Sequence, residues 1–488
     1  MFELELEDKL HEECGVFGIF RNNGDSVVPE TYHALYALQH RGQESCGIAV
    51  NRDRVLSCYK DLGLVNEVFT RDALQKIPDG SIAIGHCRYG TTGGNHRDNA
   101  QPLLINHFKG QMALCHNGSL TNAAKLRREL ESAGAIFHTS IDSEVIAYVI
   151  TGERLRSPSV EAAVLAAMKR LEGAYSLVLM SPSKLIAARD PYGFRPLCMG
   201  DLNGDTVFAS ESCALDAIGA RFVRDIRPGE VVKVTSLGVE SYQLDHKRKS
   251  AMCVFEFIYF ARPDSVIEGA SVHEARLRAG AYLALDHPVD ADIVIGVPDS
   301  GLDAALGFSR QSGIPYGVGF IKNRYIGRTF IQPTQQQRTD QVRIKLNVLK
   351  HTVQGKRVVL VDDSIVRGTT AARIVKLLRE AGAAQVHMRL SSPPFIKPCY
   401  FGTDVDSQEA LIAHHHTVEE IRGIIGVDSL GFLSIGSCDK LAVGAACGFC
   451  KGCFTGQYPA PIPENDKDKS FGRDLIDKQR GKACEVCQ

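Results

Sequence analysis

Two adjacent carboxylates, Asp362 and Asp363, follow an apolar run at residues 358–361 that is typical of a buried strand. Free backbone N–H groups in a loop and at a helix start bind phosphate, and carboxylates beside them bind sugar hydroxyls or a hydrated magnesium ion. An ordinary strand-loop-helix crossover is the alternative, but the whole string favours a site for a phosphorylated sugar. Its candidate phosphate-binding residues form the loop Ser364, Ile365, Val366, Arg367, Gly368, Thr369 and Thr370, which opens an amphipathic helix.

Two further segments belong to the same predicted site. A second strand at residues 292–297 ends in a Pro/Gly loop that contains Ser300. A basic segment at residues 322–333 contains Lys322, Arg324 and Arg328 and suits a flap that closes over an anionic leaving group and excludes water. A plain strand-turn and a solvated loop remain the alternatives for these two segments.

A cysteine, Cys14, begins another apolar run at residues 15–20. A cysteine by itself is more often a packed apolar residue than a nucleophile. Polar segments follow it and favour the nucleophile; they lie at residues 40–47, 85–93, 116–119 and 139–144. Their candidate site residues are Arg88, Asn117, Gly118 and Asp142, whereas Cys46, Cys87 and Cys115 in the same segments are expected to be packing residues.

Three cysteines, Cys447, Cys450 and Cys453, stand at two-residue gaps. This spacing favours iron–sulfur or metal ligation, with zinc as the generic alternative. Another pair, Cys484 and Cys487, lies in a Pro-, Lys- and Asp-rich tail and is expected to bind nothing.

Bulk properties limit the class of protein. A chain of 488 residues with 44% hydrophobic and 23% charged residues is typical of a globular enzyme of two or three domains. A net charge of −1 gives no case for nucleic acid or an anionic membrane, and no apolar run approaches the roughly 18 residues of a bilayer span. The acidic residues 1–13 fit neither a secretory nor a transit signal, so a cytoplasmic setting is expected, without a disulfide framework for the 15 cysteines.

The elements that must position these residues change character along the chain. Residues 15–243 mix strand patterns with helical patterns, and a basic break at residues 245–250 follows. From residue 288 strands and helices alternate, with strands expected at residues 292–297, 316–321, 357–361 and 386–390, which is typical of a parallel α/β sheet.

The segment at residues 357–370 resembles the phosphoribosyl-pyrophosphate signature of the type I phosphoribosyltransferases. The resemblance implies a parallel sheet with the donor at the carboxyl ends of its strands. It also implies that Ser300, Asp362 and Asp363 lie near Mg²⁺. Displacement at the anomeric carbon would give the ribose positive charge, which the carboxylates would stabilise. It would also leave negative charge on the departing pyrophosphate, which magnesium and the flap cations would stabilise.

The segments after Cys14 are similar to the glutamine amidotransferase domain of the N-terminal-nucleophile hydrolases, which implies an αββα sandwich. In that family the mature chain begins with the cysteine, so cleavage after Glu13 is implied, and the freed α-amino group, with a pKa of about 8, serves as base. The resemblance assigns the oxyanion to the Asn117 side chain and the Gly118 N–H, and the substrate α-carboxylate to Arg88. It assigns the α-ammonium to Asp142, for which a helix N-cap is the alternative.

Together the halves resemble the amidophosphoribosyltransferases, from residue 14 to about residue 459. The implied domains are a propeptide (1–13), a glutaminase (14–245), a phosphoribosyltransferase (251–458) and a tail (459–488). The implied reaction turns phosphoribosyl pyrophosphate, glutamine and water into phosphoribosylamine, glutamate and pyrophosphate, with internal ammonia transfer, as the first step of purine synthesis. Feedback inhibition by purine nucleotides and a homotetramer are further implications. The resemblance to the branch with a [4Fe–4S] cluster assigns its ligands to Cys253, Cys399, Cys450 and Cys453, with Cys447 as the competitor.

Three rival functions fit the sequence less well than this one. A hexosamine-forming amidotransferase would need a sugar-isomerase second half. A salvage phosphoribosyltransferase would not need Cys14 and its companions. A nucleotide-binding regulator on the same fold is disfavoured by the near-neutral charge and by the complete glutaminase set.

Overall fold

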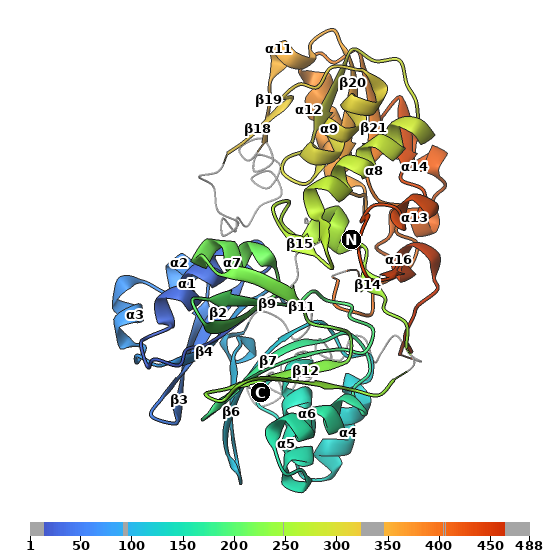
Figure 1. Cartoon of the computed structure of the whole chain (residues 1–488). Coiled ribbons are helices and arrows are strands. Elements are labelled where there is room, and N and C mark those ends of the chain that lie inside the picture. Colours follow the sequence, from blue (N-terminus) through green and yellow to red (C-terminus); the bar gives the residue numbers. More distant parts are fainter. Residues whose placement is uncertain are drawn as a thin grey trace, which may run out of the picture.

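The computed structural model describes residues 14–90, 96–246, 248–323, 346–403, 405 and 407–463. These residues form two lobes joined near residue 250 (Figure 1). Four groups of predicted features lie outside the described residues: the leader at residues 1–13, the flap residues Arg324 and Arg328, Cys484 with Cys487, and the tail beyond residue 463.

The first lobe stacks two antiparallel sheets between two layers of helices, so the αββα sandwich is confirmed. In sheet order, the seven-stranded sheet contains β11 (Arg221–Asp225), β9 (Cys198–Leu202), β10 (Asp205–Ala209), β1 (Gly15–Phe20), β4 (Ile82–Arg88), β2 (Ser45–Arg52) and β3 (Val55–Leu62). The six-stranded sheet contains β13 (Gly238–Gln243), β12 (Glu230–Thr235), β8 (Lys184–Arg189), β7 (Ser176–Ser181), β6 (Gly110–Asn117) and β5 (Leu103–His107).

Helices cover the outer face of each sheet. The seven-stranded sheet packs against α1 (Val28–Ala37), α2 (Val65–Val68), α3 (Arg71–Lys76) and α7 (Ser212–Ile218). The six-stranded sheet packs against α4 (Ala123–Ser132), α5 (Asp142–Arg156) and α6 (Val160–Met168). A short 3₁₀ turn, η1 (Arg97–Asn99), precedes β5.

The inner faces of the two sheets form a dry layer, and this layer carries the polar residues of interest. Val16 and Ile84 pack there against Ala113 and Val178 of the other sheet. Because side chains alternate along a strand, residues two or four positions from these face the same layer. The sequence periodicity therefore directs Cys14, His86, Arg88 and Asn117 between the sheets.

The second lobe is built on a four-stranded parallel sheet with helices on both faces, so the predicted parallel α/β fold is confirmed. In sheet order its strands are β17 (Ile293–Gly296), β20 (Arg357–Asp362), β21 (Gln385–Leu390) and β22 (Ser429–Phe432). One face packs on α8 (Val272–Asp286) and α9 (Gly301–Ser312), and the other on α12 (Thr369–Glu380) and α14 (Val418–Ile425).

Short elements complete the second lobe, and Figure 1 shows several of them close to the first lobe. They are β14 (Met252–Cys253), a π-helix η2 (Glu256–Phe260), β15 (Val266–Ile267), β16 (Ala270–Ser271), β18 (Phe320–Lys322), β19 (Leu346–Val348), α11 (Lys350–Val353), α13 (Ile412–His415), α15 (Ile435–Cys438), β23 (Phe449–Cys450) and α16 (Gly452–Thr455).

Two departures from the sequence prediction have physical causes. The strand expected at residues 316–321 is shorter than predicted, because β18 pairs with β19 outside the main sheet and only Tyr316 bridges to Val294. Helix α8 was not predicted from the sequence, because its polar residues do not gather on one face. It packs tightly on α9, and a Cβ on Gly280 would lie 1.8 Å from the Ala304 carbonyl oxygen.

A buried ionic contact joins the lobes. Arg41 of the first lobe donates to Glu211 of its own lobe and to Glu256 of η2, and all three side chains are fully buried. Arg195 Nη1 lies 3.5 Å from the other Glu256 oxygen. Burial alone would raise the pKa of Glu211, but the Arg41 charge and hydrogen bonds from His40 and Ser265 outweigh it and lower that pKa.

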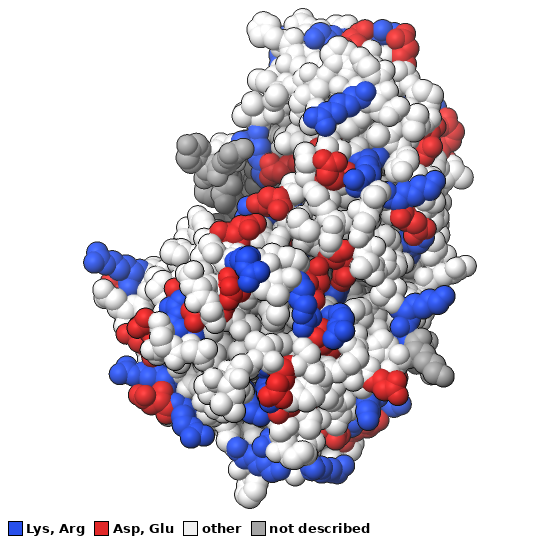
Figure 2. All heavy atoms as spheres, viewed as in Figure 1, with Lys and Arg blue, Asp and Glu red and all other residues white. Residues whose placement is uncertain are grey.

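The surface carries no dominant charge. Figure 2 shows basic and acidic side chains interspersed over the visible face. Among the described residues, no helix is long and apolar enough to cross a membrane.

We expect Glu256→Gln to destabilise the protein by roughly 3 to 5 kcal/mol, because it leaves two buried guanidinium groups with one carboxylate fewer. Calorimetry should show a melting temperature roughly 10 °C lower. The matched control is Glu240→Gln, whose carboxylate lies 2.6 Å from Lys233 Nζ but is 54% exposed, and which should melt like the parent. Equal melting of both variants would show that the contact does not hold the lobes together.

Candidate active sites

The first candidate site lies at the carboxyl edge of the parallel sheet. Asp362 ends β20 and Asp363 follows it, with only 3% and 4% of their surfaces exposed. Ser300, at the start of α9, donates from Oγ to Asp363 Oδ2 at 2.5 Å. The structure thus brings together the three residues predicted to lie near magnesium, and their oxygen atoms are the donor type that this ion prefers.

The loop after Asp363 presents a helix start to the same edge. Gly368 has φ +86°, a left-handed conformation that glycine adopts without strain, and α12 begins at Thr369. Ser364 Oγ donates to Asp363 Oδ1 at 2.5 Å, and the Val366 carbonyl accepts from the Ile412 N–H at 2.8 Å. These bonds fix residues 364–366 beside the start of α12, the part of a helix that can bind phosphate.

One predicted flap cation is described. Lys322 ends β18, and its Nζ lies 2.5 Å from Asp299 Oδ2 beside Ser300. Both side chains are about half exposed, so the ammonium is available to an incoming anion at modest cost.

The second candidate site lies between the sheets of the first lobe. Cys14 directly precedes β1 and is half-buried, and its Sγ lies 3.6 Å from the Tyr89 carbonyl oxygen. Arg88, at the end of the neighbouring β4, is 3% exposed. Burial lowers the pKa of Arg88, and the opposing effects of the charges of Cys14, Glu44 and Asp142 offset this only in part. A guanidinium in this position suits a substrate carboxylate beside the thiol.

Asn117 carries an amide donor that has no partner among the described residues. It ends β6, its side chain is 1% exposed, and its Nδ2 makes no hydrogen bond. Leaving such a donor unpaired costs about 1–3 kcal/mol, which is recovered when a ligand oxygen reaches it. This is the property expected of an oxyanion donor.

The next residue, Gly118, cannot be replaced by a larger one. It has φ +134°, and a Cβ there would lie 2.2 Å from the Ala174 carbonyl oxygen. Asp142 is the first residue of α5 rather than its N-cap, which is Ile141. Its Oδ2 accepts from the Leu120 N–H at 2.9 Å, so the same carboxylate that faces the site also fixes the turn after Gly118.

The sequence reading missed the residues that hold Asn117 in place. Gln101 Oε1 accepts from the His116 N–H at 2.8 Å, and His86 Nε2 contacts the His116 carbonyl oxygen at 2.9 Å. Burial lowers the pKa of His86 to about 3, so this ring stays neutral. Gln101 carries no sequence signal, and His86, although it lies in the polar segment at residues 85–93, is a single polar residue in an apolar strand.

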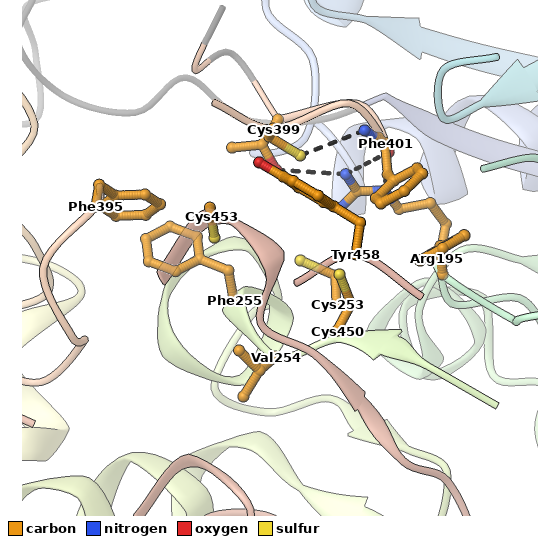
Figure 3. A pocket seen from close by; sticks show the side chains of 12 residues that line it. Arg195, Cys253, Val254, Phe255, Phe395, Cys399, Phe401, Cys450, Cys453 and Tyr458 are labelled. Atoms are coloured by element: carbon orange, nitrogen blue, oxygen red, sulfur yellow. Dashed lines mark hydrogen bonds between the residues drawn. The ribbon is translucent and has the colours of Figure 1, made fainter. Parts of the chain in front are cut away.

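Four cysteines from distant segments surround one apolar cavity (Figure 3). Cys253 of β14 and Cys450 of β23 stand opposite each other in a parallel ladder. Cys453 lies on α16, and the Cys399 N–H donates to the Val405 carbonyl. Burial, then the neighbouring Cys399, Cys253 and Cys450, raise the pKa of Cys453, so a bound cation would be needed to keep these thiols ionised together.

Cys447 does not belong to this cavity. Burial, then the charge of Glu268, raises its pKa to about 12, with Arg189 opposing and Asp225 adding to the rise. Among the described residues, no three His, Cys, Asp or Glu side chains are placed to hold a single metal ion. The four thiols around this apolar space are the ligand type that an iron–sulfur cluster takes.

Comparisons with known proteins match both lobes. Family models match a glutamine amidotransferase domain at residues 88–217 and a phosphoribosyl transferase domain at residues 273–391. The amidophosphoribosyltransferase of Synechocystis sp. is 50% identical over 461 residues, covering 94% of this chain and 93% of that protein. That of Methanocaldococcus jannaschii is 47% identical over 476 residues, covering 94% of this chain and 100% of that protein.

Solved structures show the same similarity. The glutamine phosphoribosylpyrophosphate amidotransferase from B. subtilis, complexed with ADP and GMP, matches with a TM-score of 0.86 at 46% identity, covering 93% of this chain and 98% of that chain. A structure described as the allosteric regulatory enzyme of purine biosynthesis matches with a TM-score of 0.88 at 45% identity, covering 94% of this chain and 99% of that chain.

Asn117→Ala removes the unpaired amide, and we expect it to lower kcat for glutamine hydrolysis by about 10²- to 10³-fold with little change in KM. Glutamate release is the measurement. The control is Asn106→Ala, an exposed asparagine on β5 whose side chain bonds Gln111, and this variant should keep the parent rate. Equal rates for the two variants would remove Asn117 from the oxyanion site.

Proposed function

This chain belongs to the amidophosphoribosyltransferase family, and we propose how its own residues divide the work of that reaction. It converts phosphoribosyl pyrophosphate, glutamine and water into 5-phosphoribosylamine, glutamate and pyrophosphate, the first step of purine synthesis. Identity of 47–50% to relatives along nearly the whole chain, with both domains matched, is the observation that carries this conclusion.

The glutaminase half-reaction takes place at Cys14. Removal of residues 1–13 would free an α-amino group on the same residue as the thiol, and that amine accepts the thiol proton. The thiolate attacks the side-chain amide of glutamine, Asn117 and Gly118 stabilise the oxyanion, and ammonia leaves before water hydrolyses the thioester. Arg88 binds the α-carboxylate and Asp142 the α-ammonium of the substrate.

The transfer half-reaction takes place at Asp362 and Asp363. The two carboxylates hold the ribose hydroxyls and favour the positive charge that develops on the ring, and the loop from Ser364 to Thr370 holds the 5-phosphate. Lys322, with Arg324 and Arg328 of the proposed flap, neutralises the departing pyrophosphate. Magnesium, when bound by Ser300, Asp362 and Asp363, supplies further positive charge to the leaving group.

Internal transfer of ammonia follows from chemistry at neutral pH. Ammonium predominates in water and is not a nucleophile, so ammonia released at Cys14 has to reach the anomeric carbon before it is protonated. The buried contact of Arg41 with Glu256 supports this proposal, because it keeps water from part of the boundary between the lobes.

A [4Fe–4S] cluster is the proposed cofactor of Cys253, Cys399, Cys450 and Cys453. When bound, it supplies covalent links between the interlobe connection, the segment after β21 and the C-terminal strand. A role in stability, not in electron transfer, is proposed, since the reaction needs no redox step.

Regulation is proposed from a relative, and assembly and location from the resemblance of the sequence. A matched protein was solved with ADP and GMP, so purine nucleotides are the proposed inhibitors of this chain. A homotetramer and a cytoplasmic setting are the proposed assembly and location.

We expect the parent protein to release glutamate and pyrophosphate together, each stimulated by the other substrate. Cys14→Ala should abolish glutamine-dependent synthesis but leave synthesis from ammonia, because the two sites use separate residues. Cys46→Ala, which changes a fully buried packing thiol, is the control and should keep both activities. Loss of the ammonia reaction in Cys14→Ala alone would contradict the separation of the sites.

The cluster proposal has a test independent of activity. Protein purified without oxygen should contain about four iron atoms and as much acid-labile sulfide per chain. Cys453→Ser should lose most of both, whereas Cys447→Ser, at a similar depth but outside the cavity, should retain them. Zinc in place of iron, or equal losses in both variants, would overturn the assignment.

A further inference from the structure

A short loop of the second lobe, residues 399–403, reaches the glutaminase site of the first lobe. It begins at Cys399, one of the four cysteines of the cavity, where the Phe401 N–H contacts the Cys399 sulfur at 3.4 Å. Three residues after Cys399, at Gly402, its backbone lies against Gly118. The loop is therefore shared between the cysteine cavity and the oxyanion site.

The first lobe holds this loop in place through the fully buried guanidinium of Arg195. Arg195 donates to the Phe401 carbonyl from Nε at 3.1 Å and from Nη2 at 2.7 Å. Its Nη2 also lies 3.4 Å from Thr403 Oγ1. The Phe401 ring stacks on Phe194 with centroids 4.2 Å apart and planes 14° apart. These contacts leave the loop little freedom to move relative to the first lobe.

Gly402 is the residue that makes the close approach. It has φ +115°, and a Cβ there would lie 3.3 Å from both the Cα and the carbonyl carbon of Gly118, and 3.1 Å from Arg195 Nη2. On its other side Gly118 abuts Ala174, whose carbonyl oxygen a Cβ on Gly118 would meet at 2.2 Å. Gly118 is thus held between the backbone of Ala174 in its own lobe and the backbone of Gly402 in the second lobe.

From this arrangement we infer that Gly402 is a positioning residue for the glutaminase reaction, because it fixes the Gly118 peptide at the oxyanion site from the second lobe. The inference deepens the proposed function and rests on it. Oxyanion donors must lie within a few tenths of an ångström of their target, so a displaced peptide lowers the rate even when the substrate still binds. The glutaminase site is therefore complete only when the second lobe is docked.

The test is Gly402→Ala, whose added Cβ must displace the Gly118 peptide or the Arg195 side chain. We expect kcat for glutamine hydrolysis to fall by about 10- to 100-fold, while KM for glutamine changes by less than about threefold, since Arg88 and Asp142 are untouched. Alkylation of Cys14 by iodoacetamide, which needs no oxyanion donor, should keep its rate. Synthesis from ammonia should also keep its rate.

The matched control is Gly110→Ala. Gly110 has φ +127°, so alanine is strained there to a similar degree, but no atom lies within 4 Å of the added Cβ. This variant should keep the parent kcat. A parent-like kcat in Gly402→Ala, or an equal fall in both variants, would overturn the inference.

A second variant keeps the inference testable if Gly402→Ala does not fold. Thr403→Val removes the hydroxyl that Arg195 contacts and adds neither strain nor bulk. It should lower kcat for glutamine at least about twofold, with ammonia-dependent synthesis unchanged, and a parent-like kcat would then overturn the inference. Absence of glutamate release from the parent protein would instead contradict the proposed function, whatever the variants do.

Discussion

The buried contact of Glu256 with Arg41 and Arg195 is the constraint on which the rest of the structure depends. A carboxylate with no exposed surface is tolerated only when it is paired, so its two guanidinium partners hold the lobes in one relative position. Next to Arg41, Gly42 lies against the backbone that carries Arg88, where a Cβ would be 2.5 Å from the Cys87 carbonyl carbon. The interlobe contact and the glutamine site therefore form one rigid unit.

That rigidity matters because the two reactions need opposite electrostatic environments. Glutamine hydrolysis builds negative charge on an oxygen and needs donors, for which the Asn117 amide, buried and without a partner among the described residues, is the proposed group. Ribosyl transfer builds positive charge on a sugar and needs the carboxylates of Asp362 and Asp363 at a sheet edge. Neither charge pattern could serve the other reaction, so the chain keeps them on separate lobes and joins them through buried polar contacts.

The cysteine cavity lies where the two lobes meet in sequence and in space. The Cys253–Cys450 ladder ties the residues just after the interlobe connection to the last described strand, and Cys399 starts the loop that Arg195 grips. Links among these segments would stiffen the same boundary that Glu256 holds. A cluster bound there would therefore stabilise the protein, in keeping with a reaction that needs no redox step.

The sequence by itself determined both fold classes and supplied the candidate residues of both centres. Apolar runs with polar ends are local features, so the bounds of β1 were predicted to the residue. Tertiary structure alone decided what lies far apart in the chain but close in space. It separated Cys447 from the cavity, gave Asp142 a second role at Leu120, and placed Gly402 against Gly118. Such contacts could not be predicted because they depend on packing between lobes, which leaves no periodicity or spacing in the residues that make it.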